Sequence, residues 1–306
     1  MNMLIHIGGN KTASTLLQRR LFSKHPAIRY LGEDCEGYSG LRPLLNSLVS
    51  DDDSHFDLAK AKEVFADRFT PSDQDAVCVY SNEDIMTSPL PSVCAARLKE
   101  LMPEAEIVMV IRNQLTTWPS WYANHGAYLK QVPRSYWRKH VTLVEWLEYC
   151  FSFPNQTPVE AMNYDRYYKI FSEQFGPDRV RVLMYEDLLA DPDAYYRQWA
   201  ALLGISEQSV QQYVATHVER ARNGARRMYY DRWSSRLSWV PGLSAMQAPI
   251  LSSFKPVSAW LDAGPAATVD LPEAWIARIC NYYRESNSKL AERTKLDLGR
   301  YGYPLG

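Results

Sequence analysis

The chain has 306 residues, 46% of them hydrophobic and 23% charged, and its 34 Lys and Arg against 35 Asp and Glu leave a net charge of −1. This balance is typical of a globular protein with a sizeable core, and it excludes a mainly disordered chain. It also lacks the strong basic excess of a general nucleic-acid-binding protein, so we expect no nucleic-acid partner.

Five cysteines lie far apart along the chain, and no two of them form a C-x-x-C pair. We therefore expect reduced thiols in a cytoplasmic protein rather than disulfides or a zinc site. No secretory signal is expected, because the chain begins directly with an apolar strand. No apolar run is long enough to predict a membrane span.

Short apolar runs alternate with amphipathic segments along the first third of the chain. Residues 3–7 predict a buried strand, followed by a glycine-rich turn and a helix over 11–22. The elements expected next are a helix at 56–69, a strand at 75–80, a helix at 92–102 and a strand at 106–111.

The same alternation continues in the rest of the chain. The elements expected there are helices at 114–130, 164–175, 192–203, 206–217 and 272–292, a strand at 179–184, and mixed helix and loop at 131–163. Strands alternating with helices predict an α/β fold of three layers, with a mainly parallel central sheet covered on both faces and helical insertions. No linker divides the chain, so we predict a single domain over residues 1–306.

The turn after the first strand, Gly8-Gly9-Asn10-Lys11-Thr12-Ala13-Ser14-Thr15, has the chemistry of a phosphate or sulfate site. Glycines allow a tight turn, and the amides of a helix N-terminus favour an anion. Lys11 adds a positive charge and the three hydroxyl residues add donors. It is not a Walker A loop, because G-x-x-x-x-G-K-[ST] is absent. The alternative is an ordinary strand-to-helix turn with a capping Ser or Thr.

Two further strands also end in polar residues. Arg112 and Asn113 follow the strand at 106–111, and Ser120 lies near the start of the next helix. Ligands of open α/β sheets bind at such strand ends, where an Arg guanidinium and a Ser hydroxyl can converge on a second anion. The alternative is a structural Arg paired with a carboxylate. Tyr185-Glu186-Asp187-Leu188 follows the strand at 179–184.

Taken together, these segments resemble the sulfotransferases that use 3′-phosphoadenosine 5′-phosphosulfate (PAPS). The resemblance covers roughly residues 1–217 and 272–304, and residues 287–304 are similar to the end of many bacterial members. The family's loop usually reads Pro-Lys-Ser-Gly-Thr-Thr. Here the lysine and every hydroxyl are kept, but Ala13 must adopt a backbone conformation that glycine usually serves.

The resemblance implies a role for each matching residue. The 5′-phosphosulfate would be held by the turn, that is by Gly9, Asn10, Lys11, Thr12, Ala13, Ser14 and Thr15. Arg112 and Ser120 would hold the 3′-phosphate, and Tyr185 would contact the adenosine. A late basic loop usually completes the 3′-phosphate site, and the local residues for it are Arg222, Asn223, Arg226 and Arg227. Residues 218–268 would form a loop region that covers cofactor or substrate.

Sulfuryl transfer requires a base for the acceptor proton and a positive charge at the leaving phosphate. Lys11 suits the second task. Glu83, just after the strand at 75–80, suits the first, because many family members place a Glu or His base there. The alternative is a helix-cap acid, which fits Asp84 better. His125 is the reserve base.

The sequence therefore predicts an enzyme that moves a sulfuryl group from PAPS to a hydroxyl or amine of a glycan or small metabolite, without a metal. One rival is a P-loop-type nucleotide kinase, which needs magnesium and a late lysine in its loop. The other is a catalytically silent relative that only binds nucleotide. Neither the acceptor nor the oligomeric state can be predicted from the sequence.

Overall fold

The structure is a computed structural model that describes residues 2–70, 77–123, 141–214, 225–230, 255–263, 265 and 267–306. The chain forms two compact units. The first comprises residues 1–113, 158–218 and 281–306, and the second comprises residues 114–157 and 219–280. Each is described by itself.

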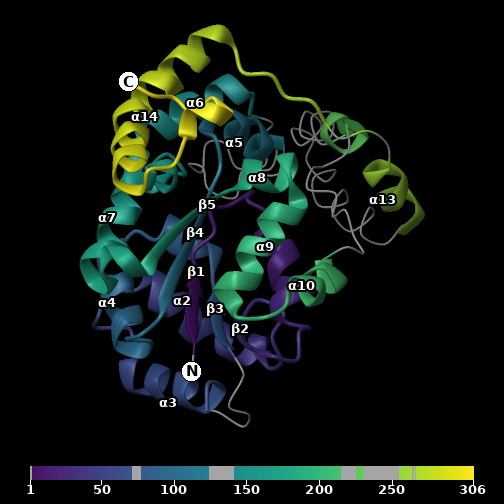
Figure 1. The fold of residues 1–306 in the computed structure, drawn as a ribbon. Coiled ribbons are helices and arrows are strands. Elements are labelled where there is room, and N and C mark those ends of the chain that lie inside the picture. Colours follow the sequence, from purple (N-terminus) through teal and green to yellow (C-terminus); the bar gives the residue numbers. More distant parts are fainter. Residues whose placement is uncertain are drawn as a thin grey trace. The chain divides into compact units, whose positions relative to one another are not determined.

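A parallel sheet forms the centre of the first unit (Figure 1). Its strands are β1 (Met3–His6), β2 (Ile28–Gly32), β3 (Val77–Ser81), β4 (Glu106–Ile111) and β5 (Val180–Met184). They lie in the order β2-β3-β1-β4-β5, and every neighbouring pair is parallel. The carboxyl ends of the strands therefore lie together at one edge of the sheet, which is where polar residues follow them. The predicted mainly parallel α/β fold is confirmed.

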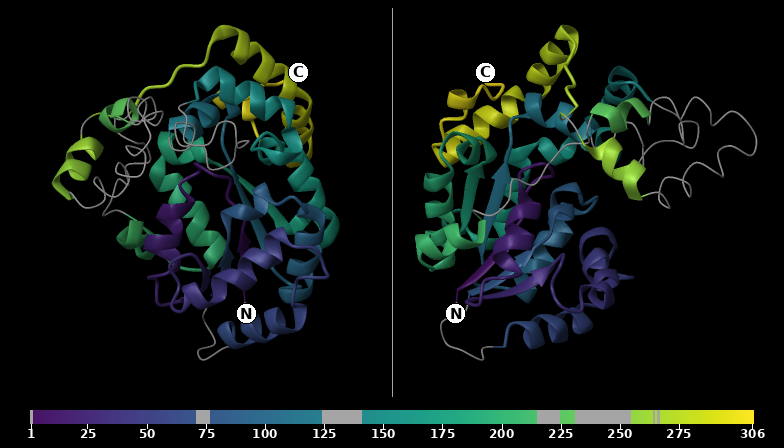
Figure 2. Two further views of the ribbon diagram at one scale, coloured as in Figure 1. Left: turned by 180° about the vertical axis from the view of Figure 1, so that it is seen from behind. Right: turned by 90° about the vertical axis from the view of Figure 1, so that its right-hand side faces the viewer.

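Helices cover both faces of this sheet (Figures 1 and 2). The helical segments of the first unit are α1 (Ser14–Leu16), η1 (Leu17–Phe22), α2 (Tyr38–Ser50), α3 (Leu58–Arg68), η2 (Glu83–Thr87), α4 (Pro91–Leu101), η6 (Glu160–Met162), α7 (Tyr164–Phe175), η7 (Pro177–Arg179), α8 (Tyr185–Ala190), α9 (Pro192–Leu203), α10 (Glu207–Val214), η8 (Leu298–Tyr301) and the second part of α14 (Glu273–Thr294). α9, α10 and η1 pack on one face, whereas α4 and α7 pack together on the other.

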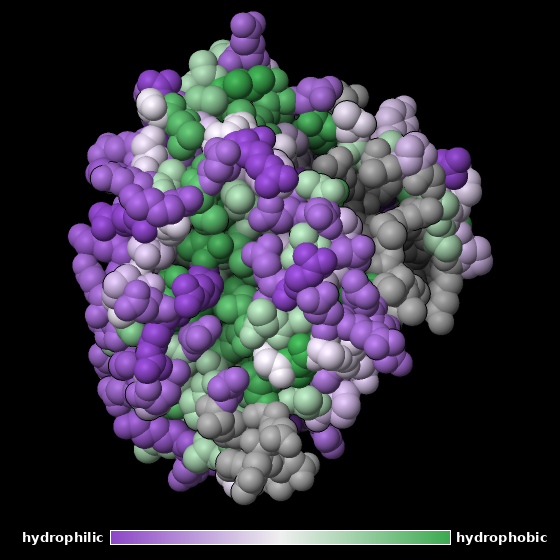
Figure 3. All heavy atoms as spheres, in the orientation of Figure 1, coloured by the Kyte–Doolittle hydropathy of each residue, from purple (hydrophilic) through white to green (hydrophobic). Residues whose placement is uncertain are grey.

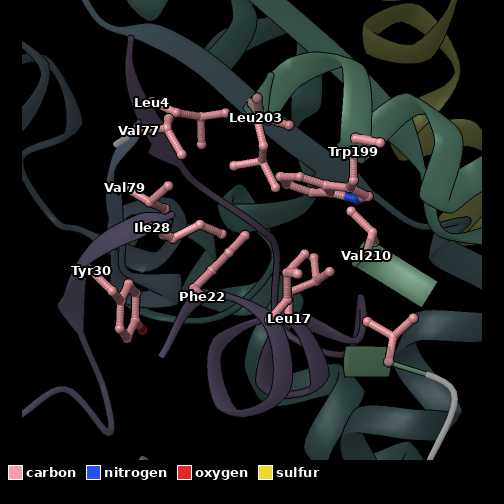
Figure 4. Packing of buried hydrophobic residues seen from close by; sticks show 14 of the residues in the cluster. Leu4, Leu17, Phe22, Ile28, Tyr30, Val77, Val79, Trp199, Leu203 and Val210 are labelled. Atoms are coloured by element: carbon pink, nitrogen blue, oxygen red, sulfur yellow. The ribbon is translucent and has the colours of Figure 1, made fainter. Parts of the chain in front are cut away.

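The core on the α9 face is built from alternate strand residues, because side chains of a strand point in turn to opposite faces. Leu4, Val77 and Val79 meet Phe22 of η1 and Trp199 of α9 in this core (Figure 4). Trp199 is fully buried, and its ring lies 5.5 Å from that of Phe22. Figure 3 shows one face of the molecule, on which hydrophilic residues lie on both sides of a band of apolar residues.

Several elements agree closely with the expectations, whereas β2, α2, α8 and α13 were missed. β4, α7 and α9 have the predicted bounds. β2 and α2 were not predicted at all. β2 is a five-residue edge strand that includes Arg29 and ends in Gly32, so its sequence resembles a loop; α2 contains Pro43 in its interior, which usually argues against a helix. The helix predicted from residue 11 begins only at Ser14, because the turn extends through Ala13.

The second unit is helical in the part that the structure describes. Its segments are α5 (Gln114–Trp121), α6 (Leu143–Ser152), η5 (Pro154–Gln156), a helical turn at 225–230, α13 (Lys255–Asp262) and the first part of α14. Thr142 begins α6 with a capping box, in which its hydroxyl and the Glu145 carboxylate satisfy each other's backbone amides. Trp118 is fully buried and packs edge-on against Trp146.

All five cysteines are free, and three of them are buried. Among the helices that the structure describes, none is long and apolar enough to cross a membrane. The prediction of a single domain over residues 1–306 stays a prediction.

Candidate active site

The Gly-rich turn lies between β1 and α1 and is held by the neighbouring strand. The amide of Gly9 donates to the carbonyl oxygen of Val110 in β4 at 3.0 Å. Lys11 and Ala13 have φ angles of 72° and 63°, in the left-handed region that favours glycine. The expectation for Ala13 is thus confirmed. Two left-handed residues within three positions fold the turn back over the start of α1.

The three hydroxyl residues of the turn do different things. Thr12 is buried and donates from Oγ1 to the carbonyl oxygen of Gly9 at 2.5 Å. The Ser14 hydroxyl, also buried, lies 3.1 Å from Thr12 Oγ1. Because a hydroxyl has one proton and Thr12 gives it to Gly9, Ser14 is the donor of this pair. Thr15 is only partly buried. In this state Thr12 and Ser14 therefore brace the turn.

The start of α1 offers backbone donors to an anion. The N–H groups of a helix's first turn have no intrahelical acceptor, and here they belong to Ser14 and Thr15. The partial positive charge of a helix N-terminus adds to the Lys11 charge. The arrangement is chemically suited to a phosphate or sulfate group.

Arg112 joins the end of β4 to this turn. Its Nη1 donates to the carbonyl oxygen of Lys11 at 2.8 Å, and its guanidinium lies over the Tyr185 ring at 4.6 Å. The Tyr164 hydroxyl fixes its backbone by donating to the Arg112 carbonyl oxygen at 2.6 Å. The structure thus brings Lys11, Arg112 and Tyr185 together, three residues that lie far apart in the sequence. Arg112 is buried, with 6% of its surface exposed.

The Tyr-Glu-Asp segment after β5 also holds the C-terminal segment. Glu186 accepts from the backbone amide of Asn113 at 2.9 Å and from the Tyr303 hydroxyl at 2.8 Å. Asp187 accepts from the Tyr301 hydroxyl at 2.7 Å. Two motifs that the sequence analysis cited separately are therefore hydrogen-bonded to each other beside Arg112.

Glu83 is the first residue of η2, is separated from the end of β3 by Asn82, and is partly buried. Burial raises its pKa to about 7, and the charges of Glu33 and Asp84 contribute to the rise. The charges of Lys11 and Arg19 oppose the rise. A carboxyl with a pKa near 7 is suited to general-base work at neutral pH. The helix cap here is Asn82, whose side chain accepts from the Asp84 amide, so the expectation of Asp84 as the cap is wrong.

An open cavity of about 220 Å³ adjoins Glu83 in the first unit. It lies where β2 and β3 end, and Asn10 of the turn is one of its lining residues. Gln18, Glu33 and Tyr38 also line it, and the sequence analysis named none of them. Glu33 directly follows β2. Had that strand been recognised, the rule that ligands bind at strand ends would have pointed to this residue.

The other predicted site residues lie either in the second unit or outside the described residues, so their positions relative to Lys11, Arg112 and Glu83 are not described. Ser120 lies in α5 of the second unit and is buried. Arg226, also in the second unit, lies 4.8 Å from the centre of the Trp260 ring. His125, Arg222 and Asn223 lie outside the described residues.

Comparison with known proteins gives the family. The model of the sulfotransferase family matches residues 4–209. The chain belongs to the sulfotransferase family, and it is a transferase of the sulfotransferase class. A search of curated protein sequences finds no match.

One solved structure supports the fold, and two others are similar to smaller degrees. A sulfotransferase from Alicyclobacillus acidocaldarius is 16% identical, with a TM-score of 0.52, over 98% of this chain and 99% of that one. The sulfotransferase domain from the curacin biosynthetic pathway is 15% identical, with a TM-score of 0.43, over 74% and 81%. Mouse sulfotransferase SULT7A1, complexed with PAP, is 12% identical, with a TM-score of 0.38, over 85% and 87%.

Proposed function

We propose that this sulfotransferase takes the sulfuryl group from PAPS and passes it to a hydroxyl of a glycan or small metabolite by in-line transfer. The observation that carries the proposal is the hydrogen bond from Arg112 to the carbonyl oxygen of Lys11. It brings the Arg112 guanidinium to the turn that carries Lys11, and the amides and left-handed residues of this turn suit a phosphosulfate. The same guanidinium lies over Tyr185, which supports an adenosine contact beside it.

The left-handed turn and the Arg112 guanidinium beside it support binding of the donor. In the proposal, the turn from Gly9 to Thr15 would hold the 5′-phosphosulfate, Arg112 and Ser120 the 3′-phosphate, and Tyr185 the adenosine. Bound PAPS would supply a sulfur atom that forms a bond to the acceptor oxygen as its bond to the 5′-phosphate oxygen breaks, with the electron pair leaving on that phosphate.

This chain's own residues then manage charge and protons. Glu83 accepts the acceptor's proton, which its position beside the cavity and its raised pKa support. Lys11 neutralises the charge that develops on the leaving phosphate oxygen. His125 stays the reserve base.

The remaining expectations are kept as part of the proposal. They are a single sulfotransferase domain over residues 1–306, coverage of cofactor or substrate by residues 218–268, completion of the 3′-phosphate site by Arg222, Asn223 and Arg226, catalysis without a metal, a bacterial origin and a cytoplasmic location.

The proposal is tested by titrating adenosine 3′,5′-bisphosphate (PAP) and adenosine 5′-phosphate into the protein in the presence of EDTA. The two nucleotides differ only in the 3′-phosphate. We expect PAP to bind about ten- to a hundredfold more tightly, because charged hydrogen bonds to that phosphate contribute about 1.5–3 kcal/mol. Equal affinities would contradict the proposal. The titrations are repeated with magnesium in place of EDTA, and binding that occurs only with magnesium would favour the kinase rival.

A further inference from the structure

The cavity beside Glu83 is small, polar and rich in carboxylates. Glu33, Glu83 and Asp84 line it, and none of its described lining residues is Lys, Arg or His. Its volume of about 220 Å³ lies below that of typical sites for drug-sized ligands, so it suits one functional end of a molecule. A carboxylate is an acceptor only, so these groups call for donors.

The cations near the cavity leave its negative charge in excess. Arg19 is held by Asp34, with Nε 2.6 Å from the carboxylate, and lies 3.7 Å from Glu33. Burial raises the pKa of the Asp84 carboxyl, and the charge of Arg42 only partly opposes this rise. Lys11 belongs to the turn and is the charge that the donor's phosphosulfate would meet.

A second, independent observation comes from Gln18. This side chain lines the cavity and is buried, with 2% of its surface exposed. Its Nε2 donates to Ser81 Oγ at 3.0 Å, whereas its Oε1 has no hydrogen-bond partner. A buried acceptor without a partner is destabilising, and a donor entering the cavity would remove that cost.

On the basis of the proposed function, we infer that the acceptor substrate carries a protonated amine, and that the cavity lined by Gln18, Glu33 and Asp84 binds this ammonium. An ammonium has three donors and a positive charge, which match the carboxylates and Gln18 Oε1. Its nitrogen has no free lone pair, so a neighbouring hydroxyl of the same molecule attacks sulfur. That hydroxyl loses its proton to Glu83, and PAP leaves with the electron pair.

The test uses two small probes of nearly equal size, 1,3-diaminopropan-2-ol and glycerol. PAP is first titrated into the full-length protein, and each probe is then titrated into the PAP-saturated protein at pH 7. We expect the diamine to bind at least about tenfold more tightly than glycerol, because only the diamine places charge among the carboxylates. Glu33→Gln and Asp84→Asn should each reduce this preference at least about threefold. Glu36→Gln is the matched control, because Glu36 is exposed on the same segment but does not line the cavity.

The order of the titrations separates the two proposals. If PAP binds but the diamine and glycerol bind equally, or if neither binds, the amine inference is overturned while the proposed function stands. A preference that Glu36→Gln reduces as much as Glu33→Gln does also overturns it. If PAP itself does not bind, the proposed function fails, and the inference fails with it.

Discussion

Arg112 donates from Nη1 to the carbonyl oxygen of Lys11 at 2.8 Å, so the end of β4 holds the turn that follows β1. The two residues lie 101 positions apart in the chain. The bond orients the guanidinium over Tyr185 and fixes the backbone of Lys11 in its left-handed conformation. One side chain thereby couples the geometry of the two anion sites proposed for the donor.

Arg112→Ala should weaken PAP binding about ten- to a hundredfold, because a buried charged donor is lost from the 3′-phosphate. The affinity of Arg112→Lys for PAP should lie between those of Arg112→Ala and the wild type, since lysine keeps the charge but lacks the planar fork. Calorimetric titration measures both. If Arg112→Ala weakens the binding of adenosine 5′-phosphate as much as that of PAP, the side chain supports the turn and does not bind the 3′-phosphate.

Lys11→Ala should lower kcat more than it raises the KM for PAPS. Its charge is proposed to act on the phosphate oxygen that becomes more negative in the transition state, and interactions of that kind appear in kcat. Steady-state kinetics with labelled PAPS measures the two constants. An unchanged kcat with a raised KM would make Lys11 a binding residue only.

The pH dependence of kcat/KM should follow Glu83. Because the pKa of this carboxyl is raised to about 7, it is protonated and inactive as a base below that pH. We expect kcat/KM to rise about tenfold per pH unit below 7 and to level off above it. A profile that is flat between pH 5 and 8 would exclude Glu83 as the base.

The same shift gives a stability prediction with a definite sign. The pKa of Glu83 is about 7 in the folded protein against an ordinary value of 4.5, so the folded state binds more protons between these values. The free energy of unfolding should therefore fall as pH rises through that window. Glu83→Gln removes this contribution, and urea denaturation at pH 5 and pH 8 should show a smaller difference for the variant than for the wild type. An unchanged difference would contradict the raised pKa.

Tyr303→Phe should lower the free energy of unfolding by about 1–3 kcal/mol, because it leaves Glu186 Oε2 without its buried donor. Tyr303 is 3% exposed. Tyr301→Phe is the matched control, since Tyr301 donates to Asp187 in a less buried place and should cost less. Urea denaturation gives both values. Equal losses of unfolding free energy would mean that burial does not decide how much these two hydrogen bonds contribute.

The sequence predicted the parallel sheet well because four of its strands are continuous apolar runs that end in polar residues. β2 was missed because an edge strand needs less apolar sequence, and with it the sequence analysis missed Glu33 at its carboxyl end. The roles of Thr12 and Ser14 could not be read from the sequence either. Whether a hydroxyl faces a ligand or braces its own turn depends on the backbone angles of Lys11 and Ala13.

Long-range pairings were also beyond the sequence. The hydrogen bonds of Glu186 and Asp187 to the tyrosines of residues 301–303 depend on where the chain returns to the sheet. Periodicity carries no information about such contacts. By contrast, Glu83 could be singled out because its place two residues after the end of a strand is a local feature; its role as the base stays a prediction.

The most direct test of the account is the turnover of labelled PAPS by Glu83→Gln, with a mixture of hydroxyl acceptors. Gln is nearly the same size as Glu but cannot take a proton. We predict normal folding, normal PAP binding and a rate lower by about 10²–10⁴-fold, which is the typical effect of losing a general base. His125→Ala is measured beside it and should keep its activity. Near-normal turnover by Glu83→Gln together with loss of activity in His125→Ala would contradict the account and assign the base to His125.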